Sequence, residues 1–261
     1  MRSLDLSRLG RRAAVMAGVT TAVSTAACSD GAVAPHPTRV TASASSAVGP
    51  TGSYAIYDTP PVIDGVMDPG EWNGAEWSTF PVWIPGDIMF PSSTATVYVG
   101  RDPSYMYLAL TFDRNSPFRS NDHVSFEFDR DHDGVAETGD DIVGIYATSQ
   151  SPFDNYRFKA GMFVASDESN GGANNAIGRF KTSGGKGVIE IRKEMNSADV
   201  AHDFSIDNAG GGGYVTMGMR TMIALEKGQP GSATYDRSWE PGYSTYCTLL
   251  VARRRVEISC P

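Results

Sequence analysis

The stretch ATVYVGRDPSYMYLALTF, residues 95–112, decides the fold class. Its two runs, 95–100 and 105–112, combine aromatic and β-branched residues, which favour extended backbone. The four residues between them, RDPS, carry the proline and the polar side chains typical of a turn. The stretch therefore predicts two consecutive strands joined by a short connection.

The rest of the chain repeats this pattern, and no stretch shows a convincing helical period of 3.6 residues. Six further strands are expected, over 123–129, 141–149, 156–166, 187–195, 213–225 and 246–259. Clusters of Gly, Asn and Asp such as SNGGANN and DNAGGGG separate them as turns. These features predict an all-β fold, an antiparallel β-sandwich of two sheets with jelly-roll or immunoglobulin-like architecture and long loops.

The N-terminal region has the composition of an export signal. A basic start, MRSLDLSRLGRR, precedes a run of small apolar residues that ends in STAA. Cys28 follows directly, and this context resembles the lipobox of bacterial lipoproteins, whose cysteine is lipidated after cleavage. We therefore expect a lipoprotein signal peptide over 1–27 and lipid on Cys28; an ordinary signal peptide with an incidental cysteine is the alternative.

The next segment, 28–52, is rich in Ser, Ala and Pro without a hydrophobic period. Such a composition cannot form a core, so we expect a disordered tether that leads into one β-sandwich domain over 53–261. The expected location is outside the cytoplasm, lipid-anchored to the bacterial cell envelope at the outer membrane or cell surface.

The charge of the chain excludes one class of partner. Cleavage before Cys28 removes four of 22 basic and one of 30 acidic residues, which changes the net charge from −8 to −11. Nucleic acid is excluded because its phosphates require basic surfaces. Membrane contact is expected through the lipid anchor alone.

Two cysteines, Cys247 and Cys260, remain in the expected domain. An exported protein meets an oxidising environment, so a disulfide between them is the simplest prediction. Two free thiols are the alternative.

A resemblance begins at PPVIDGVMDPGEWNGAEWSTF, residues 60–80. This block resembles the opening of family 9 carbohydrate-binding modules and their DOMON-like relatives, in which an IDGxxDxxEWxxA signature recurs. The matching positions are Ile63, Asp64, Gly65, Asp68, Glu71, Trp72 and Ala75. Two later blocks, ATVYVGRDPSYMYLALTFDRN and NDHVSFEFDRDHDG, are similar to the strands and the acidic loop that follow in that family.

The resemblance covers Pro60 to about Asp141 and implies a β-sandwich that binds a polysaccharide or glycan and commonly holds calcium. The residues themselves give a simpler reading of the first block. Asp64 and Gly65 can form a turn that needs a left-handed backbone. Trp72 offers a large apolar face, and we interpret it as a core residue.

The acidic stretch FEFDRDHDGVAETGDD, residues 126–141, has the spacing of a calcium loop. Carboxylates at alternating positions converge on one point, glycine at the sixth position permits the sharp turn, and position seven supplies a backbone carbonyl. The predicted ligands are Asp129, Asp131, Asp133, Val135, Glu137 and Asp140, with Asp141 able to replace Asp140 and otherwise facing solvent together with His132. Oxygen-only ligands predict a structural Ca²⁺ ion; a solvated acidic turn is the alternative.

Aromatic residues near both ends of the domain are candidates for stacking on sugar rings. YDRSWEPGYSTY, residues 235–246, is interpreted as a loop that gathers aromatics with Arg and Glu. The candidate ligand-binding residues are Trp77, Trp83, Tyr235, Arg237, Trp239, Glu240 and Tyr243. The alternative is that these aromatics only close the edge of the sandwich.

No catalytic constellation is recognisable. The sequence lacks a nucleophile elbow, a zinc-type His pair and a phosphate loop. The acidic residues Glu190, Glu194, Glu226 and Glu240 are expected at the surface. The sequence therefore predicts a non-catalytic, calcium-stabilised carbohydrate-binding lipoprotein.

Two alternatives remain open. One is a haem-binding electron-transfer module, as found among relatives of this sandwich, with His123 or His202 and one methionine as axial ligands. The candidate methionines are Met162, Met195, Met217, Met219 and Met222. The other alternative is a structural or assembly protein of the cell surface with envelope protein partners.

Overall fold

The computed structural model describes residues 52–82, 93–114, 117–159, 163–183, 185–204, 214–227, 235–240, 246–252 and 255–260. The predicted signal peptide and nearly all of the predicted tether lie outside these residues, as do Cys28, Trp83 and Tyr243. The boundaries expected at residues 27 and 52 therefore stay predictions.

The described chain is built from strands. They are β1 (Gly52–Ile56), β2 (Glu76–Val82), β3 (Ser93–Arg101), β4 (Tyr105–Asp113), β5 (His123–Asp129), β6 (Asp141–Tyr146), β7 (Pro152–Lys159), β8 (Phe163–Ser166), β9 (Ile177–Ser183), β10 (Lys186–Glu194), β11 (Tyr214–Glu226), β12 (Tyr235–Glu240), β13 (Cys247–Ala252) and β14 (Arg255–Ser259). A single 3₁₀ turn, η1 (Glu168–Asn170), is the one helical element of the described chain, and no helix there has the length and apolarity to cross a membrane.

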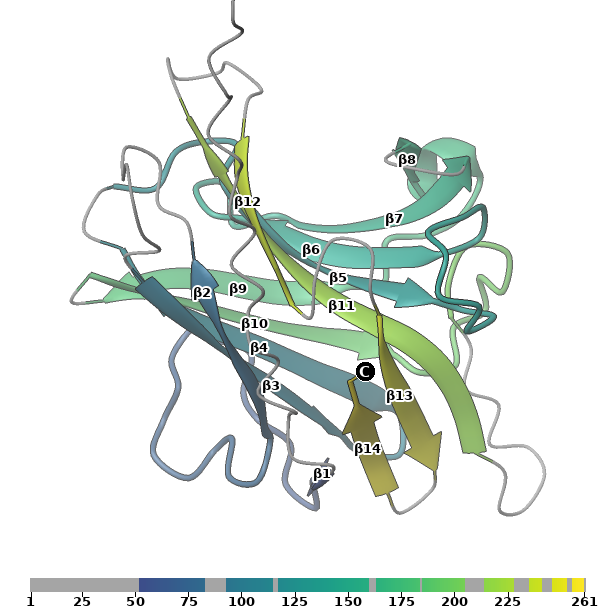
Figure 1. Ribbon diagram of the computed structural model, residues 1–261, viewed down its shortest axis with the longest axis horizontal. Helices are drawn as coiled ribbons and strands as arrows, with labels where there is room; N and C mark the ends of the chain where they lie inside the picture. The colour runs from purple at the N-terminus through teal and green to yellow at the C-terminus, as the bar shows by residue number, and fades with distance from the viewer. Residues whose placement is uncertain are drawn as a thin grey trace, which may run out of the picture. The chain divides into compact units, whose positions relative to one another are not determined.

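Two layers face each other, as Figure 1 shows. The first, sheet A, has the order β8-β7-β6-β5-β11-β13-β14, and β12 also pairs with β11. The second, sheet B, consists of β2, β3, β4, β10 and β9, and all pairs within both layers are antiparallel. The predicted antiparallel β-sandwich is thus confirmed.

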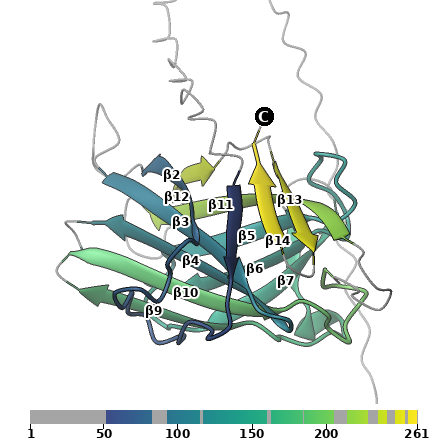
Figure 2. The ribbon, with the colours of Figure 1, turned by 90° about the horizontal axis from the view of Figure 1, so that it is seen from below.

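Strand β1 connects the two layers along one edge. It pairs antiparallel with β14 of sheet A and parallel with β3 of sheet B, and Figure 2 shows it beside β14. This parallel pair is an exception to the antiparallel pattern. Because β1 joins both sheets, hydrogen bonding runs continuously from β8 to β9.

The main core lies between the sheets and follows from strand alternation, since successive side chains point to opposite faces. Val124, Phe126 and Phe128 of β5 face Leu108 and Leu110 of β4 within one buried cluster. Burying a side chain of this size stabilises the fold by about 1.5–3 kcal/mol. The alternating apolar pattern that predicts these strands therefore also identifies the core.

A second apolar cluster covers the outer side of sheet B. Trp72 and Ala75 of the first sequence block pack there on Tyr107 and Ala109 of β4. The interpretation of Trp72 as a core residue is confirmed. The predicted turn is present as well, because Gly65 adopts a φ of 81°, in the left-handed region.

Glu190 of β10 holds this block in place. Its Oε2 accepts the backbone N–H groups of Asp64 (2.9 Å) and Gly65 (2.7 Å), and its Oε1 accepts the indole Nε1–H of Trp72 (3.0 Å). Burial raises the pKa of this carboxyl group. The expectation of a surface position is wrong for Glu190, and also for Glu226, because both are fully buried.

The strand predicted over 141–149 ends at Tyr146, and two further predicted strands each divide into two. The run 156–166 divides into β7 and β8, and 246–259 forms the hairpin β13–β14. The predicted disulfide is confirmed, since Cys247 and Cys260 are bonded across this hairpin with a Cα–Cα distance of 4.2 Å. Strands β1, β2, β9 and β12 were not predicted.

Candidate functional site: the outer face of sheet A and the acidic loop

Sheet A has a side that points away from the core. Because Val124, Phe126 and Phe128 of β5 point inward, His123, Ser125 and Glu127 point to the opposite side. The register places these three residues opposite Ala224, Met222 and Arg220 of β11, and Met222 opposite Trp239 of β12. We call this side the outer face.

One end of the outer face carries an aromatic cluster. The His123 ring lies 5.4 Å from Tyr146, 6.1 Å from Phe153 and 5.6 Å from Tyr235, measured between ring centres. The guanidinium of Arg237 lies 5.3 Å from the Tyr235 ring. Burial lowers the pKa of His123, which keeps the imidazole neutral at pH 7. Tyr146 is 37% exposed and Arg237 is exposed, so solvent reaches this cluster.

Beside this cluster lies a buried ionic network. Glu127 accepts hydrogen bonds from Arg157 (2.8 Å) and from Nε of Arg220 (2.9 Å). The guanidinium carbon of Arg220 lies 4.6 Å from the ring centre of Trp239 and 4.5 Å from that of Tyr246. The network therefore holds the half-buried Trp239 through a cation–π contact.

Several polar atoms of this face have no hydrogen-bond partner within the part of the chain that the structure describes. They are Ser125 Oγ, Tyr246 Oη, and Nε and Nη1 of Arg157. All belong to buried side chains, and a buried polar group without a partner costs about 1–3 kcal/mol. Such buried groups mark a place where an internal water molecule can supply the missing bonds.

The predicted ligand residues divide into those that the structure brings together and those that it does not. Tyr235, Arg237 and Trp239 lie on one face of β12, which pairs with the long strand β11. The interpretation as a loop is therefore wrong for 235–240, and residues 241–245 lie outside the described residues. Trp77 is 2% exposed within the main core and offers no face to a ligand. The backbone of Glu240 ends β12 opposite Thr221, and the structure does not describe the Glu240 side chain.

Among the described residues of this face, the sequence analysis named only Tyr235, Arg237 and Trp239 as sugar ligands. The additional residues are His123, Ser125, Glu127, Tyr146, Phe153, Arg157, Arg220 and Tyr246. They come from five segments far apart in the chain, so their proximity depends on the strand register. The only local signal is the occurrence of charged residues inside otherwise apolar strands.

The acidic loop follows β5 directly. Asp129 accepts the backbone N–H groups of His132 and Gly134, both at 2.8 Å. His132 and Gly134 adopt left-handed φ values of 61° and 82°. Asp133 closes a further turn on the N–H of Val135 at 2.7 Å. The chain therefore wraps around its own carboxylates, as the predicted spacing requires.

Three of the predicted metal ligands converge. Carboxylate oxygens of Asp129, Asp131 and Asp133 lie within 4.8 Å of one another. Oxygens that bind one Ca²⁺ at 2.3–2.6 Å lie at most about 5 Å apart, so these residues fit a calcium ion. The charges of Asp133 and Asp131 raise the pKa of Glu137, which places this carboxyl group in the same negative field.

Asp140 and Asp141 lie on opposite sides of the β5–β6 region. Burial, with the charge of Asp129 added, raises the pKa of Asp140 to about 7, and its Oδ2 accepts the N–H of Glu137. Asp141 lies between the sheets, fully buried, with Oδ2 3.5 Å from the ammonium of Lys193. The expectation of Asp141 as a solvent-facing residue or loop ligand is therefore wrong, because adjacent strand residues alternate in direction.

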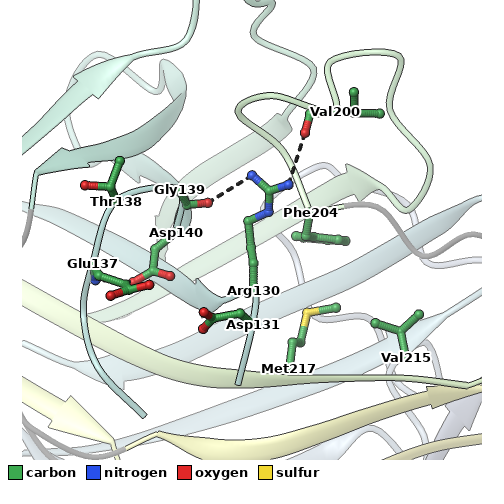
Figure 3. Close-up of a pocket in the computed structure, with 10 residues that line it drawn as sticks. All are labelled: Arg130, Asp131, Glu137, Thr138, Gly139, Asp140, Val200, Phe204, Val215 and Met217. Carbon is green, nitrogen blue, oxygen red and sulfur yellow. Dashed lines mark hydrogen bonds between the residues drawn. The ribbon is translucent and has the colours of Figure 1, made fainter. Parts of the chain in front are cut away.

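A cavity of about 420 Å³ lies beside the acidic loop. Asp131, Glu137 and Asp140 lie along one wall in Figure 3, with Phe204 and Met217 across from them. Arg130 crosses the cavity and donates to the carbonyl groups of Gly139 and Val200, both at 3.0 Å (Figure 3). These bonds join the acidic loop to the segment around Val200.

The described candidates for haem ligands are not arranged as a pair of axial ligands. Met195, Met217 and Met219 belong to the main core. His202 bonds with Nδ1 to Asp199 at 2.7 Å, and Met162 lies outside the described residues. Met222 and His123 lie on the outer face but are not register partners.

No family model and no curated protein sequence matches the chain. Solved structures that resemble it include a family 9 carbohydrate-binding module from Caldicellulosiruptor kristjanssonii in complex with cellotriose, and the same kind of module in complex with glucose. Identities are 16% and 17%, the alignments cover 70% of this chain and 80% and 82% of the others, and both TM-scores are 0.45. The similarity of the chain to these modules is a similarity of fold.

Proposed function

We propose that the protein is a non-catalytic carbohydrate-binding lipoprotein that binds a glycan on the outer face of sheet A. The observation that carries this proposal is the combination on that face of accessible aromatic rings with buried, hydrogen-bonding charges. Tyr235 and Trp239 offer the rings, and Glu127 and Arg220 form the ionic network beside them. The lipid on Cys28 would tether the domain to the cell envelope.

The chemistry of sugars fits this arrangement. A pyranose ring has an apolar C–H face that packs on an aromatic ring, and hydroxyl groups at its edge that donate and accept hydrogen bonds. Arg237 is exposed on the same face of β12 as Tyr235 and Trp239, and its guanidinium can donate hydrogen bonds to these hydroxyl groups.

Calcium has a structural role in this proposal. Asp129 ends β5 next to Gly218 of β11 and only two residues from Glu127, so an ion held by Asp129, Asp131 and Asp133 would fix the end of the strand that carries the ionic network. The ion supplies charge neutralisation for a turn that carries several close carboxylates.

Replacing Trp239 with alanine is expected to weaken glycan binding at least about 10-fold, because hot-spot aromatic residues contribute 2 kcal/mol or more. Affinity electrophoresis in gels that contain a panel of polysaccharides measures the change. Tyr105→Ala removes a half-buried ring from sheet B and is the matched control, with unchanged retention expected. Retention on no polysaccharide, or equal losses in both variants, would count against a glycan site on this face.

Removing calcium is expected to lower the melting temperature. An ion present at 100 times its Kd stabilises the folded state by about 2.7 kcal/mol, and EDTA abolishes this contribution. Differential scanning calorimetry with EDTA or with excess CaCl₂ measures the shift, and it should shrink in Asp133→Asn, whose side chain is exposed and tolerates the change. Identical melting curves in both buffers would refute calcium stabilisation.

A further inference from the structure

The charge of the outer face of sheet A differs from that of the whole chain, which is −8. Three carboxylates lie on the outward side of β5 and β11, and those of Glu127, Asp129 and Glu226 are all buried. Arg237 of β12 is exposed, and it is the only exposed one among the outward charged side chains that the structure describes on β5, β6, β7, β11 and β12. The accessible charge of this face is therefore positive.

Arg237 lies among the aromatic residues of the outer face. In the strand register it lies opposite Ala224 of β11, and His123 of β5 lies opposite Ala224 on the other side. Tyr235 and Trp239 are two positions before and two positions after Arg237, on the same side of β12. A guanidinium between two rings can contact the substituents of a sugar that stacks on either ring.

Arg237 is also available to a ligand. No carboxylate of the described residues forms an ion pair with it, and its guanidinium carbon lies 5.3 Å from the ring centre of Tyr235. Arg157 and Arg220 of the same face, in contrast, are both bonded to Glu127. An exposed guanidinium is weakly hydrated, so its N–H donors can exchange water for a ligand oxygen.

The two rings that would stack on a sugar each have a guanidinium beside them. The guanidinium carbon of Arg220 lies 4.6 Å from the ring centre of Trp239, and that of Arg237 lies beside Tyr235. The face of an aromatic ring carries negative partial charge, which a neighbouring cation offsets. The potential around these rings is therefore more positive than around bare rings, which favours a sugar with a negative substituent.

We propose that the glycan bound on the outer face is acidic, with an anionic oxygen group, a carboxylate or a sulfate ester, that Arg237 binds. This ligand class deepens the proposed function and rests on it. Two oxygens of such a group match the planar fork of a guanidinium, and charge-assisted hydrogen bonds are stronger than neutral ones. The net negative charge of the chain opposes this contact only weakly, because exposed charges beyond about 8 Å are largely screened at physiological salt.

Paired polysaccharides test this ligand class. Polygalacturonate, alginate and hyaluronate are immobilised beside their methyl esters, and dextran sulfate beside dextran, with cellulose and xylan as neutral glycans. Biolayer interferometry at one fixed CaCl₂ concentration measures the Kd of the protein for each. At least one acidic polysaccharide should bind at least about 10-fold more tightly than its uncharged partner. The carboxylate pairs and the sulfate pair then distinguish the two anionic groups.

Substitutions of Arg237 assign the effect to this residue. Arg237→Gln should weaken binding of the acidic polysaccharide about 10-fold and leave binding of its uncharged partner unchanged. Arg237→Lys keeps the charge without the fork and should retain part of the affinity. Arg179→Gln removes an exposed guanidinium from β9 of sheet B and is the matched control, with no change expected. Urea titration verifies that the variants are folded.

The possible outcomes separate the acidic ligand from glycan binding as such. If neutral glycans bind as tightly as acidic ones and Arg237→Gln changes no Kd, the acidic ligand is overturned while glycan binding stands. Equal losses in Arg237→Gln and Arg179→Gln would show nonspecific attraction between charges and would overturn the acidic ligand as well. Binding to no polysaccharide of either kind would overturn both proposals.

Discussion

Lys193→Met is expected to leave most of the protein unfolded at room temperature. The ammonium of Lys193 contacts Asp154 and Asp203 in a fully buried group. Removing one partner of a buried ion pair costs about 3–5 kcal/mol, because the remaining charge stays uncompensated. Here one ammonium serves several carboxylates, so the loss approaches the 5–15 kcal/mol that stabilises an ordinary domain.

Urea titration followed by circular dichroism measures this loss. Lys186→Met, at the exposed start of the same strand β10, is the matched control and should change the unfolding free energy by no more than about 0.5 kcal/mol. An unfolding midpoint for Lys193→Met equal to that of Lys186→Met would mean that the buried carboxylates are neutral without the ammonium.

Glu190→Ala has the second largest expected effect. Three buried or half-buried N–H donors, from Asp64, Gly65 and Trp72, lose their acceptor together. Each unsatisfied donor costs about 1–3 kcal/mol, so we expect a total loss of about 3–9 kcal/mol for the three. The segment 60–75 should also detach from sheet B and become sensitive to proteolysis.

The same urea titration, together with limited proteolysis, measures both effects. Glu190→Gln keeps the side-chain shape and one acceptor oxygen, so its loss should be clearly smaller. Glu194→Ala, half-buried on the same face of β10, is the positional control. If Glu190→Ala and Glu194→Ala destabilise equally, the three hydrogen bonds do not anchor the segment.

The strands that alternate strongly could be predicted from the sequence, because their pattern records which side faces the core. This holds for 95–112 and for β5, where Val124, Phe126 and Phe128 alternate with polar residues. Strand β2 could not be predicted because it contains Pro81, which occurs mainly on edge strands. Without β2, the direction of the Trp77 side chain was undetermined.

Buried charges were the main failure of sequence reasoning. Glu190 and Lys193 lie on opposite sides of β10, and both sides are covered, one by the segment 60–75 and one by sheet A. Nothing local distinguishes them from surface residues, because their partners are far away in the chain. The acidic loop, in contrast, is formed by residues that are close together in the sequence. Its turn geometry therefore agrees with the spacing of its carboxylates and glycine.

The candidate glycan surface depends on register for the same reason. Glu127, Arg157 and Arg220 come from β5, β7 and β11, and they meet only once these strands are paired. Tyr235 and Trp239 could be named from the sequence as members of an aromatic stretch. Their orientation followed only from the pairing of β12 with β11.

Chemical-shift mapping tests the glycan site most directly. The ¹⁵N-labelled domain would be titrated with an oligosaccharide of whichever polysaccharide retains it in affinity gels. We expect the largest amide shifts at 123–127 of β5, 220–226 of β11 and 235–240 of β12, and none above noise on β4 and β10. Saturable shifts confined to sheet B or to the acidic loop, with the outer face of sheet A unperturbed, would contradict a glycan site on that face.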